Sequence, residues 1–200
     1  MPAVFTFYQA IVSRSQALAG LAPLLIRLYL APVLLQAGWN KLQHFDDTVA
    51  WFGNSDWGLG LPLPLLLTVL AIAAETLGAL LLLLGLFTRL ASIPLMVTML
   101  VAIFAVHWPN GWLAIADSSS WLANERVIQS AEQLQAAKQL LQQHGNYAWL
   151  THNGSFVILN NGIEFAATYF VMLVSLFFSG GGRYTSLDYY VKRRVCAGVQ

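Results

Sequence analysis

The sequence predicts an all-α membrane protein, a bundle of four transmembrane helices with an amphipathic helix in the outer loop. Composition is the first observation behind this fold class. Of the 200 residues, 58% are hydrophobic and only 10% are charged, whereas a soluble domain carries about 25% charged residues. So few charges cannot cover a water-facing surface, which makes a soluble enzyme a poor fit. The formal net charge of +1 gives no basic surface for nucleic acid.

Four apolar stretches are the second observation. A helix needs roughly 20 mainly apolar residues to cross the hydrocarbon core of a bilayer. The predicted spans are residues 18–38, 61–87, 90–106 and 162–179. They belong to one membrane domain, residues 1–200, in which residues 108–161 form an extended outer loop.

The distribution of Lys and Arg is the third observation, and it predicts that both termini are cytoplasmic. With the N-terminus inside, six basic residues lie on the cytoplasmic side and three on the outer side. The inner residues are Arg14, Arg89, Arg183, Lys192, Arg193 and Arg194, and the outer residues are Lys41, Arg126 and Lys138. The excess on the inner side favours this orientation.

The outer loop predicts one helix. Asn124 is suited to cap its N-terminus, Glu125 stands in its first turn, and Gly145 is suited to end it. Apolar residues then repeat at helical spacing: Val127, Ile128, Ala131, Leu134 and Leu141. We expect the helix to pack on the end of the bundle or to lie on the membrane surface, and docking of a partner is the alternative.

Two ionisable residues fall near the middle of predicted spans. Arg27 lies in the first span and Glu75 in the second. At about 1.5 Å per residue, their depths differ by roughly 4–5 Å, which an arginine side chain can bridge. We therefore predict an Arg27–Glu75 ion pair. It either fixes the register of the bundle or forms a site that handles protons or a quinone.

A second polar group is predicted at the outer ends of the spans. Lys41 and His44 follow the first span, His107 ends the third, and Glu164 begins the fourth. If these ends converge, the side chains could form a proton relay or a polar lid, with Glu164 paired to Lys41 or His107. Two imidazoles and a carboxylate can bind a metal, but this spacing matches no ligand motif, so no metal site is predicted.

The cytoplasmic ends carry a third polar group. We expect Asp188 to pair with Arg89 or Arg183, and the basic run that begins at Lys192 to bind anionic lipid. The single cysteine, Cys196, excludes a disulfide within the chain. No catalytic motif is present, so the catalytic residues and any enzyme activity stay unassigned.

Several sequence runs resemble the DoxX family of bacterial membrane proteins. They are RLYLAPVLLQAGWNKL, WFG, LGLPLP, AETLGALLLLLGLFTRLAS, and NNGIEFAATYFVMLVSLFFSGGGRYTSLDYY. The resemblance implies a four-helix bundle of the bacterial inner membrane. It also implies that the recurring polar positions of the family are Arg27, Lys41, Glu75, Arg89, His107 and Glu164. The long loop before the fourth span resembles the longer members, which are encoded beside small metal-binding peptides.

The resemblance leaves several functions open. The family is named for its similarity to a subunit of a thiosulfate:quinone oxidoreductase, and members are linked to redox and thiol-stress complexes. This implies an accessory membrane subunit with a quinone or lipid-like ligand and with protein partners or further copies of itself. The alternatives are a small transporter or export accessory for a metal-linked peptide or solute, and a structural anchor.

Overall fold

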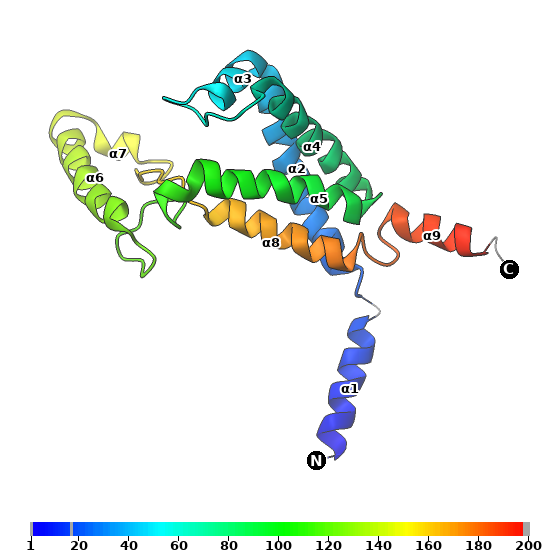
Figure 1. The fold of residues 1–200 in the computed structure, drawn as a ribbon. Helices are drawn as coiled ribbons and strands as arrows, with labels where there is room; N and C mark the ends of the chain where they lie inside the picture. The colour runs from blue at the N-terminus through cyan, green and yellow to red at the C-terminus, as the bar shows by residue number, and fades with distance from the viewer. Residues whose placement is uncertain (1, 17, 198–200) are drawn as a thin grey trace. The chain divides into compact units, whose positions relative to one another are not determined.

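The computed structural model describes residues 2–16 and 18–197, and this part of the chain is helical (Figure 1). It contains no β-strand, only an isolated antiparallel bridge between Ile115 and Leu159. The helices are α1 (Pro2–Gln16), α2 (Leu21–Gln43), α3 (Phe45–Gly53), α4 (Pro64–Leu84), α5 (Thr88–Val101), η1 (Ala102–His107), η2 (Trp108–Asn110), α6 (Glu125–His144), α7 (Tyr147–Leu150), α8 (Glu164–Ser179) and α9 (Leu187–Ala197). The predicted all-α class is confirmed.

Within the described residues, three helical stretches are long and apolar enough to cross a membrane. They are α2, α4 and the continuous stretch Thr88–Asn110, which comprises α5, η1 and η2. The fourth predicted span is the helix α8, which has only 16 residues. At about 1.5 Å per residue it is about 24 Å long, shorter than a hydrocarbon core of about 30 Å. The count of four spans is therefore not confirmed.

The end of α4 shows how local sequence sets a helix boundary. Gly85 follows the helix in the left-handed conformation, with φ of 64°, which glycine adopts without a steric penalty. The backbone amides of Gly85 and Leu86 turn back to the carbonyl oxygens of Leu82 and Leu81, as in a glycine-terminated helix end. The span therefore ends at Leu84, before the predicted end at residue 87.

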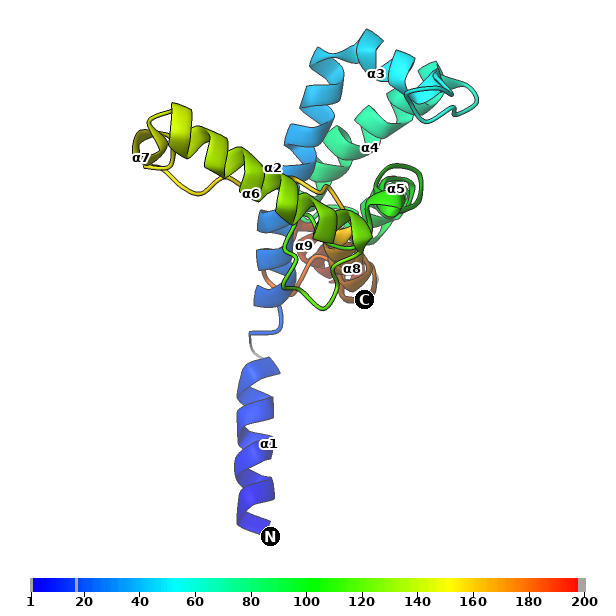
Figure 2. The same cartoon turned by 90° about the vertical axis from the view of Figure 1, so that its left-hand side faces the viewer.

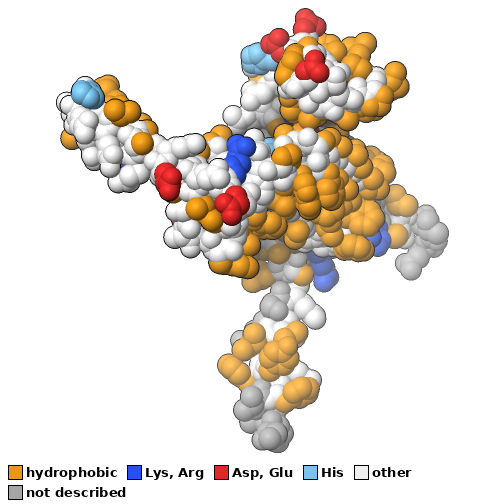
Figure 3. Space-filling model, turned by 60° about the vertical axis from the view of Figure 1, so that its left-hand side comes forward, with side chains coloured by type: hydrophobic (Ala, Val, Ile, Leu, Met, Phe, Trp, Pro, Cys, Tyr) orange, Lys and Arg blue, Asp and Glu red, His pale blue; other side chains and the backbone are white. Residues whose placement is uncertain are grey.

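The apolar helices carry hydrophobic side chains on their exposed faces as well as on their buried ones. On α4 the exposed residues include Leu65, Leu66, Val69, Leu70, Leu77, Leu80, Leu83 and Leu84. Figure 3 shows hydrophobic side chains gathered in a broad patch on the face that it draws. A helix that is hydrophobic all round is typical of a membrane span.

The chain divides into two compact units, residues 1–98 with 169–200, and residues 99–168. In the first unit α2 and α4 lie side by side (Figures 1 and 2). They are antiparallel, because Arg27 contacts the carbonyl oxygen of Leu82 whereas Lys41, further along α2, contacts Glu75. The buried apolar side chains of this unit include Leu30, Leu34, Ala79, Leu82, Leu95, Leu173 and Leu176.

In the second unit, two backbone segments pair and close the base of the long loop. The amide of Ala116 donates to the carbonyl oxygen of Ile158 at 3.0 Å, and the amide of Asn160 donates to that of Ala114 at 3.0 Å. We call this paired stretch, residues 111–116 with 158–164, the loop neck.

The helix α6 lies in the loop that the neck closes. It begins at Glu125, the side chain of Asn124 accepts a hydrogen bond from the amide of Val127, and the helix ends at His144. A helix with the predicted cap and with its end before Gly145 is therefore present, while its amphipathic character and its position outside the membrane stay predictions.

Candidate functional site

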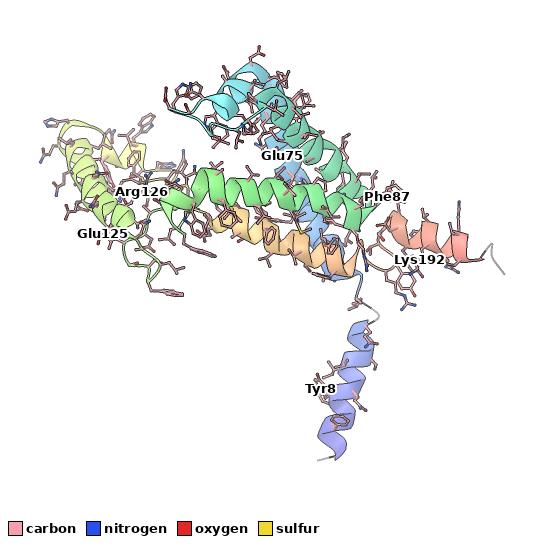
Figure 4. The ribbon with its side chains drawn as sticks, in the orientation of Figure 1. Tyr8, Glu75, Phe87, Glu125, Arg126 and Lys192 are labelled. Carbon is pink, nitrogen blue, oxygen red and sulfur yellow. The ribbon has the colours of Figure 1, made fainter. Side chains whose placement is uncertain are left out.

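An ion pair joins the two antiparallel helices of the first unit. The Nζ atom of Lys41 on α2 lies 2.9 Å from Oε1 and 2.7 Å from Oε2 of Glu75 on α4. The Glu75 side chain is 6% exposed and the Lys41 side chain 27% exposed. Figure 4 labels Glu75 on the part of α4 that lies beside α2. The pair therefore places two charges within helices long and apolar enough to span a membrane.

The predicted Arg27–Glu75 pair is wrong. Side chains on a helix tilt toward its N-terminus, and α2 and α4 run in opposite directions. The Arg27 side chain therefore extends toward the end of α4, while the Glu75 side chain extends toward the C-terminal half of α2, where Lys41 stands. The pairing register separates them further, because Gly38 of α2 lies beside Glu75 and Arg27 stands eleven residues, about 16 Å along the helix, from Gly38.

Arg27 instead holds backbone carbonyls together. Its side chain is 1% exposed. Nε donates to the carbonyl oxygen of Leu82 at 2.6 Å, and Nη2 donates to that of Leu83 at 3.0 Å. Nη1 donates to the carbonyl oxygens of Gly181 and Thr185 in the segment after α8. Because the last four carbonyls of a helix have no partner within it, Arg27 satisfies the end of α4 and fastens the later segment to it.

A further polar atom lies on the same face of α4 as Glu75. Thr68 stands seven residues before Glu75, about two turns away. Its side chain is fully buried, and its Oγ1 has no hydrogen-bond partner in the described part of the chain. Buried polar groups are normally paired, so this face has unused hydrogen-bonding capacity.

The predicted outer polar group divides between the two units. In the first unit, Lys41 pairs with Glu75, and Nδ1 of His44 lies 3.0 Å from the carbonyl oxygen of Asn40. In the second unit, Nδ1 of His107 lies 2.9 Å from the carbonyl oxygen of Asn161. Oε2 of Glu164 accepts a hydrogen bond from the amide of Ala114 at 2.9 Å. The expected pairing of Glu164 with Lys41 or His107 is therefore corrected.

The predicted partners of Asp188 are also corrected. Its carboxylate accepts hydrogen bonds from the amides of Phe87 at 2.7 Å and Thr88 at 2.9 Å, and so caps the start of α5. Nη2 of Arg89 donates to the carbonyl oxygen of Phe178 at 3.0 Å, and the guanidinium of Arg183 lies 4.8 Å from the centre of the Tyr184 ring. A carboxylate near a helix N-terminus gains from both the free amides and the helix dipole.

One structural residue was missed altogether in the sequence. Asn160 is 2% exposed, and its Nδ2 donates to the carbonyl oxygens of Asn110 at 2.9 Å and Leu113 at 2.6 Å. Its Oδ1 accepts a hydrogen bond from Nε of Arg126 at 3.2 Å. It therefore joins the two sides of the loop neck to α6. In the sequence, the one signal for Asn160 is its place in the pair Asn160–Asn161 just before the apolar stretch 162–179.

The described side chains offer no ready metal site. Among residues 2–16 and 18–197, no three His, Cys, Asp or Glu side chains are grouped so that they could hold a metal ion. The group best suited to bind a ligand is the Lys41–Glu75 pair, which can hold an uncharged polar ligand group by hydrogen bonds.

Comparisons with known proteins confirm the resemblance. Residues 22–108 match the model of the DoxX family. The chain is also 31% identical over 86 residues to the Inner membrane protein YphA of Escherichia coli (strain K12), a match that covers 42% of this chain and 59% of that protein. No solved structure matches the chain. Lys41 and Glu75 both lie within the matched region. The chain is therefore similar to the DoxX family, and three of its described helical stretches are long and apolar enough to cross a membrane.

Proposed function

We propose that this DoxX-like chain is an accessory subunit of a redox or stress-related complex in the bacterial inner membrane. In this proposal the Lys41–Glu75 pair binds a quinone or another lipid-like ligand that carries a carbonyl group. The observation that carries the proposal is the pair itself, in which a 6% exposed carboxylate lies within a membrane-spanning helix. Ionisable residues are costly at such depth and by default indicate a functional site.

The geometry of the pair suits a carbonyl ligand. An ammonium group has three N–H donors and no acceptor, and the two Glu75 oxygens take two of these donors. The third donor is free to bind a carbonyl oxygen, and the 27% exposure of Lys41 leaves it accessible. Glu75 balances the lysine charge, so the neutral head of a quinone enters a site with no net charge. Arg27 has no such role, because it is buried and four of its five N–H donors already bind backbone carbonyls.

Native mass spectrometry of the protein, extracted gently from its own membrane, tests the proposal and identifies the ligand. The proposal expects a bound quinone in the wild type and its loss in Lys41→Met. Lys138→Met on α6 removes the same charge away from the site and is the matched control. A wild-type protein that carries no ligand, or a ligand that Lys41→Met retains, contradicts the proposal and favours a structural anchor. A copurified metal-linked peptide favours the transport alternative.

The proposal includes four spans with both termini cytoplasmic. The helix α8 has an apolar sequence after Glu164, and a short span is accommodated by local thinning of the bilayer. The excess of Lys and Arg on the inner side supports this orientation.

The single native cysteine provides a test of this topology, because Cys196 is exposed on α9. A membrane-impermeant maleimide should label Cys196 in inverted membrane vesicles but not in intact spheroplasts. The opposite pattern is expected for Gln135→Cys on α6 in a Cys196→Ser background. Labelling of Cys196 in intact spheroplasts contradicts a cytoplasmic C-terminus.

A further inference from the structure

A pocket of about 490 Å³ lies at the end of the first unit where α4 is followed by α5. Its walls come from the turn before α5, the start of α5, the glycine segment 180–182 and the start of α9. Figure 4 labels two of the lining residues, Phe87 in the turn before α5 and Lys192 on α9. The pocket is separate from the Lys41–Glu75 pair, none of whose residues lines it.

The pocket carries an excess of positive charge. Arg89, Arg183 and Lys192 line it together with one carboxylate, that of Asp188. Both Asp188 oxygens accept hydrogen bonds from backbone amides. Within the described residues, none of the three cations has a carboxylate oxygen within 4.0 Å, since the ion pair found there is Lys41–Glu75. No carboxylate neutralises these three charges, although one Nη of Arg89 donates to Phe178 and the Arg183 guanidinium lies over the Tyr184 ring, so their positive charge is available to an anion.

The surroundings of the pocket are apolar and exposed. Phe87 and Leu90 line it and are 60% and 66% exposed, and Phe178, whose carbonyl binds Arg89, is 72% exposed. Leu90 belongs to the helical stretch long enough to span a membrane. An anion that binds here therefore has hydrophobic side chains beside it. A phospholipid needs both features, a cationic site for its phosphate and an apolar surface for its acyl chains.

The helix α9 adds a second apolar surface next to the pocket. Leu187, Val191 and Val195 follow one another at intervals of four residues and are 43%, 52% and 63% exposed. Residues at this spacing lie on one face of a helix. An exposed apolar stripe on a basic helix is typical of a helix that lies in the membrane interface.

We propose that this pocket binds the phosphate of an anionic glycerophospholipid. The guanidinium groups of Arg89 and Arg183 can form paired hydrogen bonds to phosphate oxygens, and Lys192 adds a point charge. The acyl chains lie against Phe87, Leu90 and the apolar face of α9. The chemistry shared with free phosphate is the phosphoryl anion, and the exposed apolar rim selects the lipid.

The test is a titration of delipidated protein in neutral detergent, followed by native mass spectrometry. The probes are phosphatidylglycerol, phosphatidylcholine and inorganic phosphate. We expect phosphatidylglycerol to bind at least tenfold more tightly than phosphatidylcholine, and inorganic phosphate at millimolar concentration not to displace it. Equal binding of the two lipids, or displacement by inorganic phosphate, overturns the proposal.

Matched variants distinguish the pocket from general attraction to a basic tail. Arg89→Gln with Arg183→Gln removes two cations from the pocket, and Arg193→Gln with Arg194→Gln removes two from outside it. A basic residue near an anionic lipid contributes about a fivefold change in affinity. We expect the pocket double variant to bind phosphatidylglycerol about 25-fold more weakly and the control double variant less than threefold more weakly. Equal losses overturn the proposal.

A conservative pair keeps the test valid if the Gln variants unfold. Arg89→Lys with Arg183→Lys keeps both charges and removes the paired hydrogen bonds, so it should lose affinity by less than the Gln pair does. Unchanged affinity in this pair, together with full loss in the control pair, would also overturn the proposal.

Discussion

Replacement of Arg27 by Met should destabilise the protein strongly without touching the proposed ligand site. The substitution removes a guanidinium that donates to the carbonyl oxygens of Leu82, Leu83, Gly181 and Thr185. The carbonyl of Leu82 keeps the amide of Gly85 as a donor. In the described part of the chain the carbonyl of Leu83 accepts no such turn hydrogen bond, and water is scarce at a buried helix end in a membrane.

The magnitude follows from the buried bonds. Two of the four hydrogen bonds are fully buried, those to Leu82 and Gly181. A hydrogen bond to a charged group contributes about 1.5–3 kcal/mol, so the loss of these two lowers the free energy of unfolding by about 3–6 kcal/mol. The partly buried bonds to Leu83 and Thr185 add less, because solvent and lipid headgroups can replace them.

The assay is equilibrium unfolding by sodium dodecyl sulfate in mixed micelles, followed by circular dichroism. Arg193→Met on α9 is the matched control, because it is the same substitution at an exposed residue. Arg27→Lys should fall between the wild type and Arg27→Met, since lysine keeps the charge with fewer donors. If Arg27→Met unfolds at the same detergent fraction as Arg193→Met, the carbonyl clamp is wrong.

Three further predictions follow from the remaining contacts. Lys41→Met and Glu75→Gln should each lower the free energy of unfolding by about 2–4 kcal/mol, since one charge is left without its partner. The double variant should lose less than the sum, and additive losses would exclude the pair. Asn160→Ala should lower the free energy of opening of the loop neck by about 2–3 kcal/mol, because three hydrogen bonds disappear. Hydrogen exchange of the neck amides measures this, and unchanged protection would count against it. The Ser119 hydroxyl and amide donate to Asp117 and lower the pKa of that carboxyl. The turn at Asp117 is therefore stabilised at pH values above the usual pKa of an aspartate. It loses this stabilisation as the pH falls through the lowered pKa of Asp117. In an NMR titration Ser119→Ala should raise the Asp117 pKa, and an unchanged value would refute the assignment.

The helices α4 and α6 could be predicted from the sequence because their signals are local. The apolar stretch and the glycine at position 85 place α4 within a few residues, and Asn124 with Gly145 places α6 at its observed ends. Apolar composition, helical periodicity and capping residues indicate a helix within a short stretch of sequence, so they can be recognised without knowing the contacts between helices.

The partners of the charged residues could not be predicted in this way. The sequence placed Arg27 and Glu75 at similar depth, but the two helices pair in another register, in which Gly38 lies beside Glu75 and Arg27 is eleven residues away. In this register Lys41, three residues beyond Gly38, is the residue whose side chain reaches Glu75.

The contacts between distant segments were beyond prediction from a single sequence. Arg27 binds the carbonyl of Gly181, which is 154 residues away, and Asp188 caps α5 across 100 residues. The loop neck likewise joins segments on either side of α6. These contacts depend on where the helices place their ends in space, and no local pattern records that.

The binding of a short-chain benzoquinone to the purified protein in nanodiscs tests the ligand site at the Lys41–Glu75 pair most directly. Tryptophan fluorescence follows the titration for the wild type, Lys41→Met and Lys138→Met. We expect saturable binding by the wild type and by Lys138→Met. We predict a loss of about 10–100-fold in affinity for Lys41→Met, as expected when a hydrogen bond from a charged donor is removed. Equal affinity of Lys41→Met and the wild type would contradict a ligand site at the Lys41–Glu75 pair.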